Sequence, residues 1–393
     1  MSWEEEYTRH RFLRKSAVAA LGVPALLSTR AFSSTAWAAD LTREASIPSG
    51  SNTVRVLTWE GYAAAGAYGP LAKKGVKIKA IAMNDDNVDP INKAGQYDIG
   101  TTTVGIFPNF IEAGLIQPLD LSQLPNFKQH LHSSRLYSSP QGPPLPEVAK
   151  GKVYGVPFAW GTLGVSYRTD KGPGEPKHLD DLLHSAYKGQ LAIVNDPINV
   201  IQAVSRSLGL GGTDILGNRR APLFLTKTEL DQVFKKLKEF KAQARSVYPT
   251  YGALVTAYAR GEIIAAMPDW APDAVAATKG GIKVAVTFPA DSSQSYVDSM
   301  FISSKVKATK QMYEFLNQAL AASTQLSVGK SLQIAVTNGQ AMEKLAASGP
   351  AWSVYKNPDQ VLKRAPYVVN PPVSSKTYTT TSEMLARWEQ FAK

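Results

Sequence analysis

Short runs in which apolar and polar residues alternate recur along the chain and predict β-strands. Residues 54–58 and 76–82 alternate with a period of two, and residues 97–100 form a short apolar run that suits a buried strand. The same patterning predicts later strands at 153–157, 163–167, 191–194, 263–267 and 282–286.

Apolar residues at helical spacing separate several of these strands. Residues 228–242 carry large apolar side chains every three or four positions, and Thr226, Thr228 and Glu229 suit the start of that helix. Because strands and helices alternate, the sequence predicts an α/β fold with open sheets. Shorter helices are expected at 108–113, 198–208 and 312–320, and a surface loop at 139–152.

The first forty residues have the features of a secretory signal peptide. Basic residues precede an apolar stretch at 16–27, and Ala36-Trp37-Ala38 fits a cleavage site. The segment 9–13 resembles the twin-arginine export motif but has His10 where the second arginine should stand, so the Tat and Sec routes both stay open. We expect residues 1–38 to be removed. Since the chain has no cysteine for lipid attachment, the mature protein should be free in the periplasm of a Gram-negative cell.

Composition and charge narrow the class of protein. The 393 residues are 44% hydrophobic and 19% charged, which is ordinary for a folded protein, and the length predicts two domains. No apolar run reaches the roughly 20 residues that a membrane span needs. The net charge is +11, and +9 without the five basic and three acidic residues of 1–38. The basic residues are scattered, with the densest group on the helix expected at 228–242, so we expect no nucleic-acid partner.

The sequence contains no arrangement typical of catalysis. It has no nucleophile elbow, P-loop or zinc-protease motif, and Gly209, Gly211 and Gly212 follow a predicted helix instead of opening one. His130 and His132 lie in a polar stretch that we interpret as a surface loop. We therefore expect a binding protein that is not an enzyme and holds no metal or cofactor.

Three groups place an aromatic ring near a carboxylate beside a predicted strand. Ligands of open α/β sheets bind beyond the carboxyl ends of strands, and rings with carboxylates suit an organic amine. Singly, each ring could equally be a core residue and each aspartate a helix cap; Asp273 could cap a helix starting at Ala274. The groups are Trp59-Glu60-Gly61-Tyr62, Trp270-Ala271-Pro272-Asp273 and Tyr296-Val297-Asp298.

The order of these segments resembles the periplasmic spermidine/putrescine-binding proteins of ABC transporters, within extracellular solute-binding family 1. The resemblance covers nearly the whole mature chain. It is carried by the segments L-T-W-E-G-Y at 57–62, Y-D-I at 97–99, E-A-G-L-I-Q-P-L-D at 112–120, V-P-F-A-W-G at 156–161, Y-K-G at 187–189, N-D-P at 195–197, G-E at 261–262, W-A-P-D at 270–273 and Y-V-D-S at 296–299.

The resemblance implies an α/β, two-lobed periplasmic binding protein fold with a hinge and a ligand cleft between the lobes. We expect the N-terminal lobe at 53–158 and 299–343, and the C-terminal lobe at 159–298 and 344–393. Rings would stack on the ligand's aliphatic chain and carboxylates would hold its amino groups. The ligand-binding residues that the resemblance implies are Trp59, Glu60, Tyr62, Thr103, Asp196, Trp270, Asp273, Tyr296 and Asp298.

The implied function is that of a monomeric periplasmic receptor that captures a polyamine or related small amine and delivers it to a membrane permease. Three departures from the family's pattern bear on the ligand. Asn199 stands where spermidine binders carry a glutamate, Gly105 replaces a site tyrosine, and Glu60-Gly61 shifts the acid of the first lobe by one position. They favour a shorter or less cationic ligand, and leave putrescine, agmatine and 4-aminobutyrate open.

A different solute on the same fold is the main alternative. Thiamine, a sugar or an iron complex would each fit the architecture. A ferric site would need tyrosines gathered near the hinge, for which Tyr167, Tyr248 and Tyr251 are the candidates.

Overall fold

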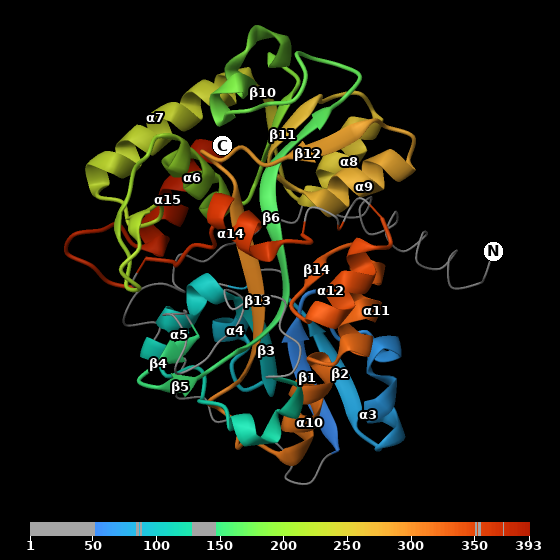
Figure 1. The fold of residues 1–393 in the computed structure, drawn as a ribbon. Coiled ribbons are helices and arrows are strands. Elements are labelled where there is room, and N and C mark those ends of the chain that lie inside the picture. Colours follow the sequence, from blue (N-terminus) through green and yellow to red (C-terminus); the bar gives the residue numbers. More distant parts are fainter. Residues whose placement is uncertain are drawn as a thin grey trace.

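Two lobes of mixed α/β structure are joined by two long strands that run through both of them (Figure 1). The computed structural model describes residues 52–83, 86, 89–127, 147–349, 352, 355–371 and 373–393. The expected signal peptide and the His130/His132 pair lie outside the described residues. No helix within the described ranges is long and apolar enough to cross a bilayer.

One sheet passes through the whole molecule. Its two outer groups of strands are parallel, and the two central strands β6 and β13 run antiparallel to each other. Two further strands, β12 (Val284–Thr287) and β14 (Ala335–Val336), also pair with β6. The main order is β10 (Ala244–Tyr248), β7 (Leu191–Val194), β11 (Ala265–Trp270), β6 (Val156–Arg168), β13 (Gln294–Ile302), β3 (Ile99–Thr103), β1 (Thr53–Thr58) and β2 (Lys77–Ala82).

Strand β6 differs from the sequence prediction in its length. Two short strands were expected at 153–157 and 163–167, but a single strand spans Val156–Arg168 and is buried along almost all of it. The gap between the two predicted strands, residues 158–162, contains Gly161, whereas Gly164 lies inside the second predicted strand. Both positions require glycine because a Cβ atom would collide with a neighbouring part of the protein. At Gly161 it would meet the Tyr296 ring, and at Gly164 it would meet the Thr287 carbonyl.

Helices cover the sheet in both lobes and build separate cores. The core around β7 and β11 takes side chains from α6, α7, α8, α9 and α15, whereas the core around β1 takes them from α3, α10 and α11. The predicted lobe boundaries stay a prediction. The bounds are α3 (Gly69–Lys73), α4 (Asp89–Asn92), α5 (Phe107–Glu112), α6 (Pro197–Ser207), α7 (Lys227–Gln243), α8 (Tyr251–Ala259), α9 (Ala271–Lys279), α10 (Lys310–Ala319), α11 (Ala322–Leu332), α12 (Gly339–Ala346), α14 (Pro358–Arg364) and α15 (Thr381–Ala392).

The helix boundaries follow local signals in the sequence. Helix α7 starts with a capping box, in which the Thr226 hydroxyl accepts from the Glu229 N–H and the Glu229 carboxylate accepts from the Thr226 N–H at 2.8 Å. Gly209 has a φ of +66° directly after α6, and Gly114 has +65° after α5. Gly209 therefore ends α6, as predicted, whereas Gly212 already belongs to the short strand β8 (Gly212–Thr213).

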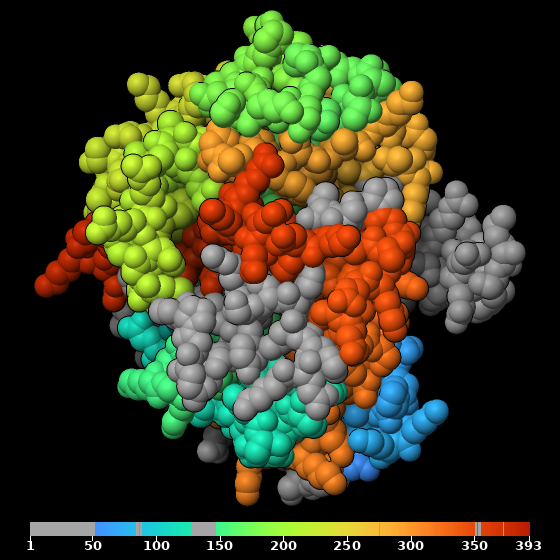
Figure 2. All heavy atoms as spheres, viewed as in Figure 1, coloured from blue at the N-terminus to red at the C-terminus, as the bar shows by residue number. Residues whose placement is uncertain are grey.

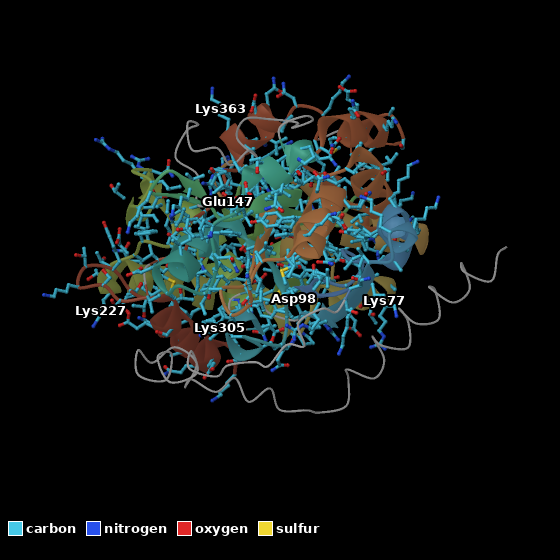
Figure 3. The ribbon with its side chains drawn as sticks, turned by 90° about the horizontal axis from the view of Figure 1, so that it is seen from below. Lys77, Asp98, Glu147, Lys227, Lys305 and Lys363 are labelled. Carbon is cyan, nitrogen blue, oxygen red and sulfur yellow. The ribbon has the colours of Figure 1, made fainter. Side chains whose placement is uncertain are left out.

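The segment predicted as a loop at 139–152 is partly ordered into strands. A two-stranded ladder pairs β4 (Val148–Ala149) with β5 (Lys152–Val153), while residues 139–146 lie outside the described part of the chain. Glu147 is buried and accepts a hydrogen bond from the Ser299 hydroxyl at 2.8 Å. It lies inside the molecule, whereas Lys77 and Lys227 lie toward opposite sides of it (Figure 3).

A segment near the C-terminus, residues 365–371, lies against both lobes, and we call it the C-terminal strap. The Asn370 N–H donates to the Gly105 carbonyl at 2.9 Å in one lobe, and Val369 packs against Phe224 in the other. Figure 2 shows orange-red residues of the C-terminal region, to which α14 and the strap belong, across the middle of one face between the upper and lower lobes. The strap thus adds a third connection between the lobes besides β6 and β13.

Candidate ligand-binding site

Asp298 lies on β13 at the centre of the hinge and is 3% exposed. The Tyr62 hydroxyl donates to its Oδ2 at 2.6 Å, and Thr103 of β3 is its cross-strand neighbour. Its other oxygen, Oδ1, is buried and makes no hydrogen bond with any described residue. One oxygen is therefore held by the protein, and the other has no hydrogen-bond partner among the described residues.

The surroundings of Asp298 disfavour a bare negative charge. Burial raises the pKa of its carboxyl to about 7; the Tyr62 hydrogen bond opposes this, and the charge of Asp86 adds to it. Asp86 is nearby because its carboxylate accepts from the Thr103 N–H at 2.9 Å. A cation at Oδ1 would allow Asp298 to ionise, so the geometry suits a positively charged ligand group.

Three aromatic rings continue the site from Asp298 into the C-terminal lobe. Tyr296 stands two residues before Asp298 and shares its face of β13. The Tyr296 and Trp270 ring centroids are 6.3 Å apart, and those of Trp270 and Tyr251 are 5.9 Å apart. These spacings are typical of aromatic pairs, and together the rings form a wall beside the hinge.

Asp196 combines a structural role with a place at this wall. It caps α6 by accepting from the Asn199 N–H, and its Oδ2 accepts from both the Tyr251 hydroxyl and the Asn199 amide at 2.8 Å. The Asn199 side-chain oxygen in turn accepts from Gln294 at 2.8 Å. Since much of its acceptor capacity is used inside the protein, Asp196 positions Tyr251 and offers a ligand less than Asp298 does.

Asp273 does not cap a helix that starts at Ala274. Helix α9 begins at Ala271, with Pro272 in its first turn, where proline is favoured; this leaves Trp270 at the N-cap and Asp273 within the first turn. Its Oδ2 is buried and unpaired among the described residues. Burial raises the pKa of Asp273 to about 6, against contacts with Asp269 and Trp270 that lower it.

The remaining predicted residues lie at the margin of these contacts. Trp59 is half-buried and packs against the cores of the N-terminal lobe, and Glu60 is exposed. No ring contact or hydrogen bond between described residues joins Trp59 to Asp298 or Trp270. The structure therefore links Tyr62, Thr103, Asp298, Tyr296, Trp270 and Asp196 by direct contacts or strand pairing, and Asp273 through its neighbour Trp270.

The sequence analysis did not identify Asp269, and it considered Tyr251 only as a ligand of a possible ferric site. Asp269 directly precedes Trp270 and is completely buried, and its position beside a predicted site tryptophan was the signal that could have found it. Tyr251 was a candidate for a ferric cluster with Tyr167 and Tyr248. Instead Tyr248 contacts Glu262 and Tyr251 contacts Asp196, and the described residues contain no group of three or more histidines and carboxylates suited to a metal ion.

Known proteins share both the sequence pattern and the architecture. The family of bacterial extracellular solute-binding proteins matches residues 63–351. The spermidine/putrescine-binding periplasmic protein of Escherichia coli (strain K12) is 25% identical over 303 residues, which is 76% of this chain and 79% of that protein.

Solved structures have the same fold. The spermidine/putrescine ABC transporter substrate-binding protein PotD from Streptococcus pneumoniae superposes with a TM-score of 0.66 at 17% identity, covering 87% of this chain and 100% of that one. A GABA receptor superposes with a TM-score of 0.61 at 17% identity over 86% and 94% of the two chains. With its two-lobed α/β architecture and its family match over most of its length, the chain belongs to the bacterial extracellular solute-binding proteins, which are binding proteins and not enzymes.

Proposed function

We propose that this protein captures a polyamine or a related small organic amine in the periplasm and delivers it to the permease of an ABC transporter. The observation that carries the proposal is the buried carboxyl of Asp298, held on one side by Tyr62 and left unpaired on the other, next to the ring of Tyr296. An ammonium group would pair with the carboxylate, and the aromatic faces would cover the attached methylenes.

The cost of burying charge supports a ligand that brings a positive one. No ion pair within the described residues involves Asp298, Asp269 or Asp273, and all three are at least nine-tenths buried. Unpaired buried carboxylates are strongly destabilising unless they are protonated or neutralised. A neutral sugar would leave that cost in place, whereas a protonated amine would remove it.

The departures from the polyamine-binding pattern support a short ligand. At Gly105, where relatives of this kind carry a tyrosine, a Cβ atom would collide with the Val368 carbonyl of the C-terminal strap. Asn199 is held by Asp196 and Gln294 within the protein. Both features reduce the room and the negative charge that a long triamine would use, which favours putrescine or agmatine over spermidine.

Calorimetric titration of the mature protein tests the proposal. Putrescine, spermidine, agmatine and 4-aminobutyrate are titrated separately, with thiamine and glucose as representatives of other solute classes. We expect at least one amine to bind with a dissociation constant on the order of 1 µM or lower. Heat from thiamine or glucose with none from the amines would overturn the proposal in favour of another solute.

Two substitutions connect binding to the described residues. Trp270→Ala should weaken the best ligand about tenfold or more, a loss of about 1.4 kcal/mol, because an aromatic face is removed. Trp270→Phe keeps a ring and should lose less. An exposed substitution, Asp231→Asn, controls for net charge and should bind like the wild type. Unchanged affinity in Trp270→Ala would remove the ring from the site.

A further inference from the structure

A second buried carboxyl group lies at the junction between β11 and α9, one residue before Trp270. Asp269 ends the buried part of β11 and is 0% exposed. The pairing of β11 with β6 shifts register between Ala266 and Asp269, and such a bulge re-aims the side chains that follow it. The local backbone therefore gives Asp269 an orientation that simple strand alternation would not predict.

The two oxygens of Asp269 have different surroundings. Oδ1 accepts from the Trp270 backbone N–H at 2.8 Å, while Oδ2 is buried and unpaired among the described residues. The Oδ2 of Asp273 and the indole N–H of Trp270 are also buried and unpaired. These groups lie close enough together to satisfy one another only while the two carboxyls share a proton, so loss of that proton leaves acceptors beside Trp270 that a cationic ligand group can fill.

The carboxyl groups of Asp269 and Asp273 are in contact and titrate together. Burial, followed by the charge of Asp273, raises the pKa of Asp269 well above its usual range. The other polar groups around Asp269 are the hydroxyls of Ser166 on β6 and of Tyr251 and Tyr258 on α8, none of which carries positive charge. Two such carboxyls share a proton until a cation replaces it.

The pair belongs to the same region as Asp298. The ring of Trp270, which follows Asp269 directly, contacts the ring of Tyr296, and Tyr296 stands two residues from Asp298 on β13. The indole therefore lies between two acidic ends: Asp298 with Tyr62 at the hinge, and Asp269 with Asp273 in the C-terminal lobe. A short ligand along this ring would present one end to each.

We propose that Asp269 is a specificity-determining residue which, with Asp273, binds the second cationic end of the ligand, and that this end is best met by a guanidinium group. This inference rests on the proposed amine-binding function. A guanidinium offers five N–H donors in a plane, enough to reach two carboxylates at its edge while its face stacks on Trp270. An ammonium group offers three donors and satisfies the pair less completely.

The proposal separates dications from amino acids. Agmatine has an ammonium and a guanidinium, and putrescine has two ammonium groups. 4-Aminobutyrate would direct a carboxylate at either Asp298 or the Asp269–Asp273 pair, where like charges repel. The expected order of affinity is agmatine, then putrescine, with 4-aminobutyrate much weaker.

Asp269→Asn is the matched test, because the amide keeps the shape and the acceptor for the Trp270 N–H but removes the ionisable group. Titrations of wild type, Asp269→Asn and the exposed control Asp180→Asn with agmatine, putrescine and 4-aminobutyrate are run near pH 5.5, in buffers with different ionisation enthalpies. Agmatine should release about two protons on binding to the wild type, one from Asp298 and one from the Asp269–Asp273 pair, and about one proton fewer with Asp269→Asn. The variant should also lose about tenfold or more of its preference for agmatine over 4-aminobutyrate.

The possible outcomes are distinguishable. Asp269→Asn with unchanged proton release and unchanged selectivity would overturn the role of Asp269 while leaving amine binding in place. Wild-type protein that binds none of the three amines would instead overturn the proposed function. A thermal melt of each variant identifies folded protein, and Asp269→Glu, which restores the charge, should recover part of the proton release if the carboxyl group binds the ligand.

Discussion

At the scale of single residues, the hinge buries the carboxyl group of Asp298, where ionisation costs free energy. In the folded protein Asp298 has a pKa raised to about 7 by burial, so it holds its proton at pH values where the unfolded chain has already lost it. Folding is therefore favoured by this group below its unfolded pKa, and the contribution is lost as the pH rises through the folded pKa. Asp269 and Asp273 act in the same direction.

The ligand-free protein should accordingly melt at a lower temperature at pH 8 than at pH 5. Asp298→Asn, which cannot ionise, should reduce that difference, and it should weaken amine binding at pH 8. Thermal melts across this pH range, with and without the best ligand, check both effects. A variant that keeps the full pH difference of the wild type would show that Asp298 does not contribute to it.

Residue types and spacing could locate most residues of this site, but not which of its carboxyl groups are buried. The aromatic-plus-acid groups at 270–273 and 296–298 were visible in the sequence, because rings beside carboxylates at strand ends are uncommon in a plain core. Asp273 could cap a helix only if that helix started at Ala274, and α9 instead starts three residues earlier, at Ala271. The partner carboxyl Asp269 lay two residues beyond the strand predicted at 263–267 and was not singled out, since its burial depends on packing by α8 and α9.

At the scale of elements, the pairing of β6 with β13 sets the position of the aromatic wall. Gly161 stands opposite Tyr296 in this ladder, and a Cβ atom at Gly161 would lie 2.7 Å from the Tyr296 ring. The φ of Gly161 is not in the left-handed region, so the glycine serves the close approach of the ring and not a turn.

Gly161→Ala should displace Tyr296 and weaken ligand binding about tenfold or more, because the added methyl group would overlap the phenol end of the ring. Gly66→Ala, where nothing lies within 4 Å of the added atom, is the control and should bind normally. Both are compared by calorimetric titration. Full affinity in Gly161→Ala would mean that the position of Tyr296 is unimportant for the ligand.

Elements with a clear pattern could be predicted, and the others could not for identifiable reasons. Helix α7 has one apolar stripe and a capping box, so its extent follows from local sequence. Helix α8 begins Tyr251-Gly252-Ala253 and is apolar on most sides, so its sequence shows no helical periodicity of apolar residues. Helix α9 starts immediately after a strand, with no turn residues to mark its beginning. Strand β6 was predicted as two strands with a gap at 158–162, because its packing against neighbouring strands leaves no local signal of its continuity.

At the scale of the whole molecule, the C-terminal strap connects the lobes. It bonds to Gly105 in one lobe through Asn370, and its neighbour Tyr367 forms a parallel bridge with Ser295 of the hinge strand β13. Resemblance to a family predicted the two-lobed α/β architecture correctly. It could not predict the strap, because these contacts join positions over 70 residues apart through backbone atoms that are the same for any side chain.

Gly105→Ala tests the strap. The added methyl group would collide with the Val368 carbonyl, and backbone cannot give way as a side chain can. We expect a loss of about 1–3 kcal/mol in the free energy of unfolding, measured by chemical denaturation, while Gly66→Ala stays close to wild type. A stability equal to that of the control would show that the strap does not press on Gly105.

The C-terminal strap is anchored by backbone hydrogen bonds, and this determines which mutations it can tolerate. Its two anchor bonds, from the Ser295 N–H to the Pro366 carbonyl and from the Asn370 N–H to the Gly105 carbonyl, are four residues apart, and each residue spans at most about 3.6 Å. Exchanging side chains between these anchors leaves both bonds intact. Deleting one residue removes up to about 3.6 Å of chain between the two anchors, so we expect a length scan of this segment to be harsher than an alanine scan.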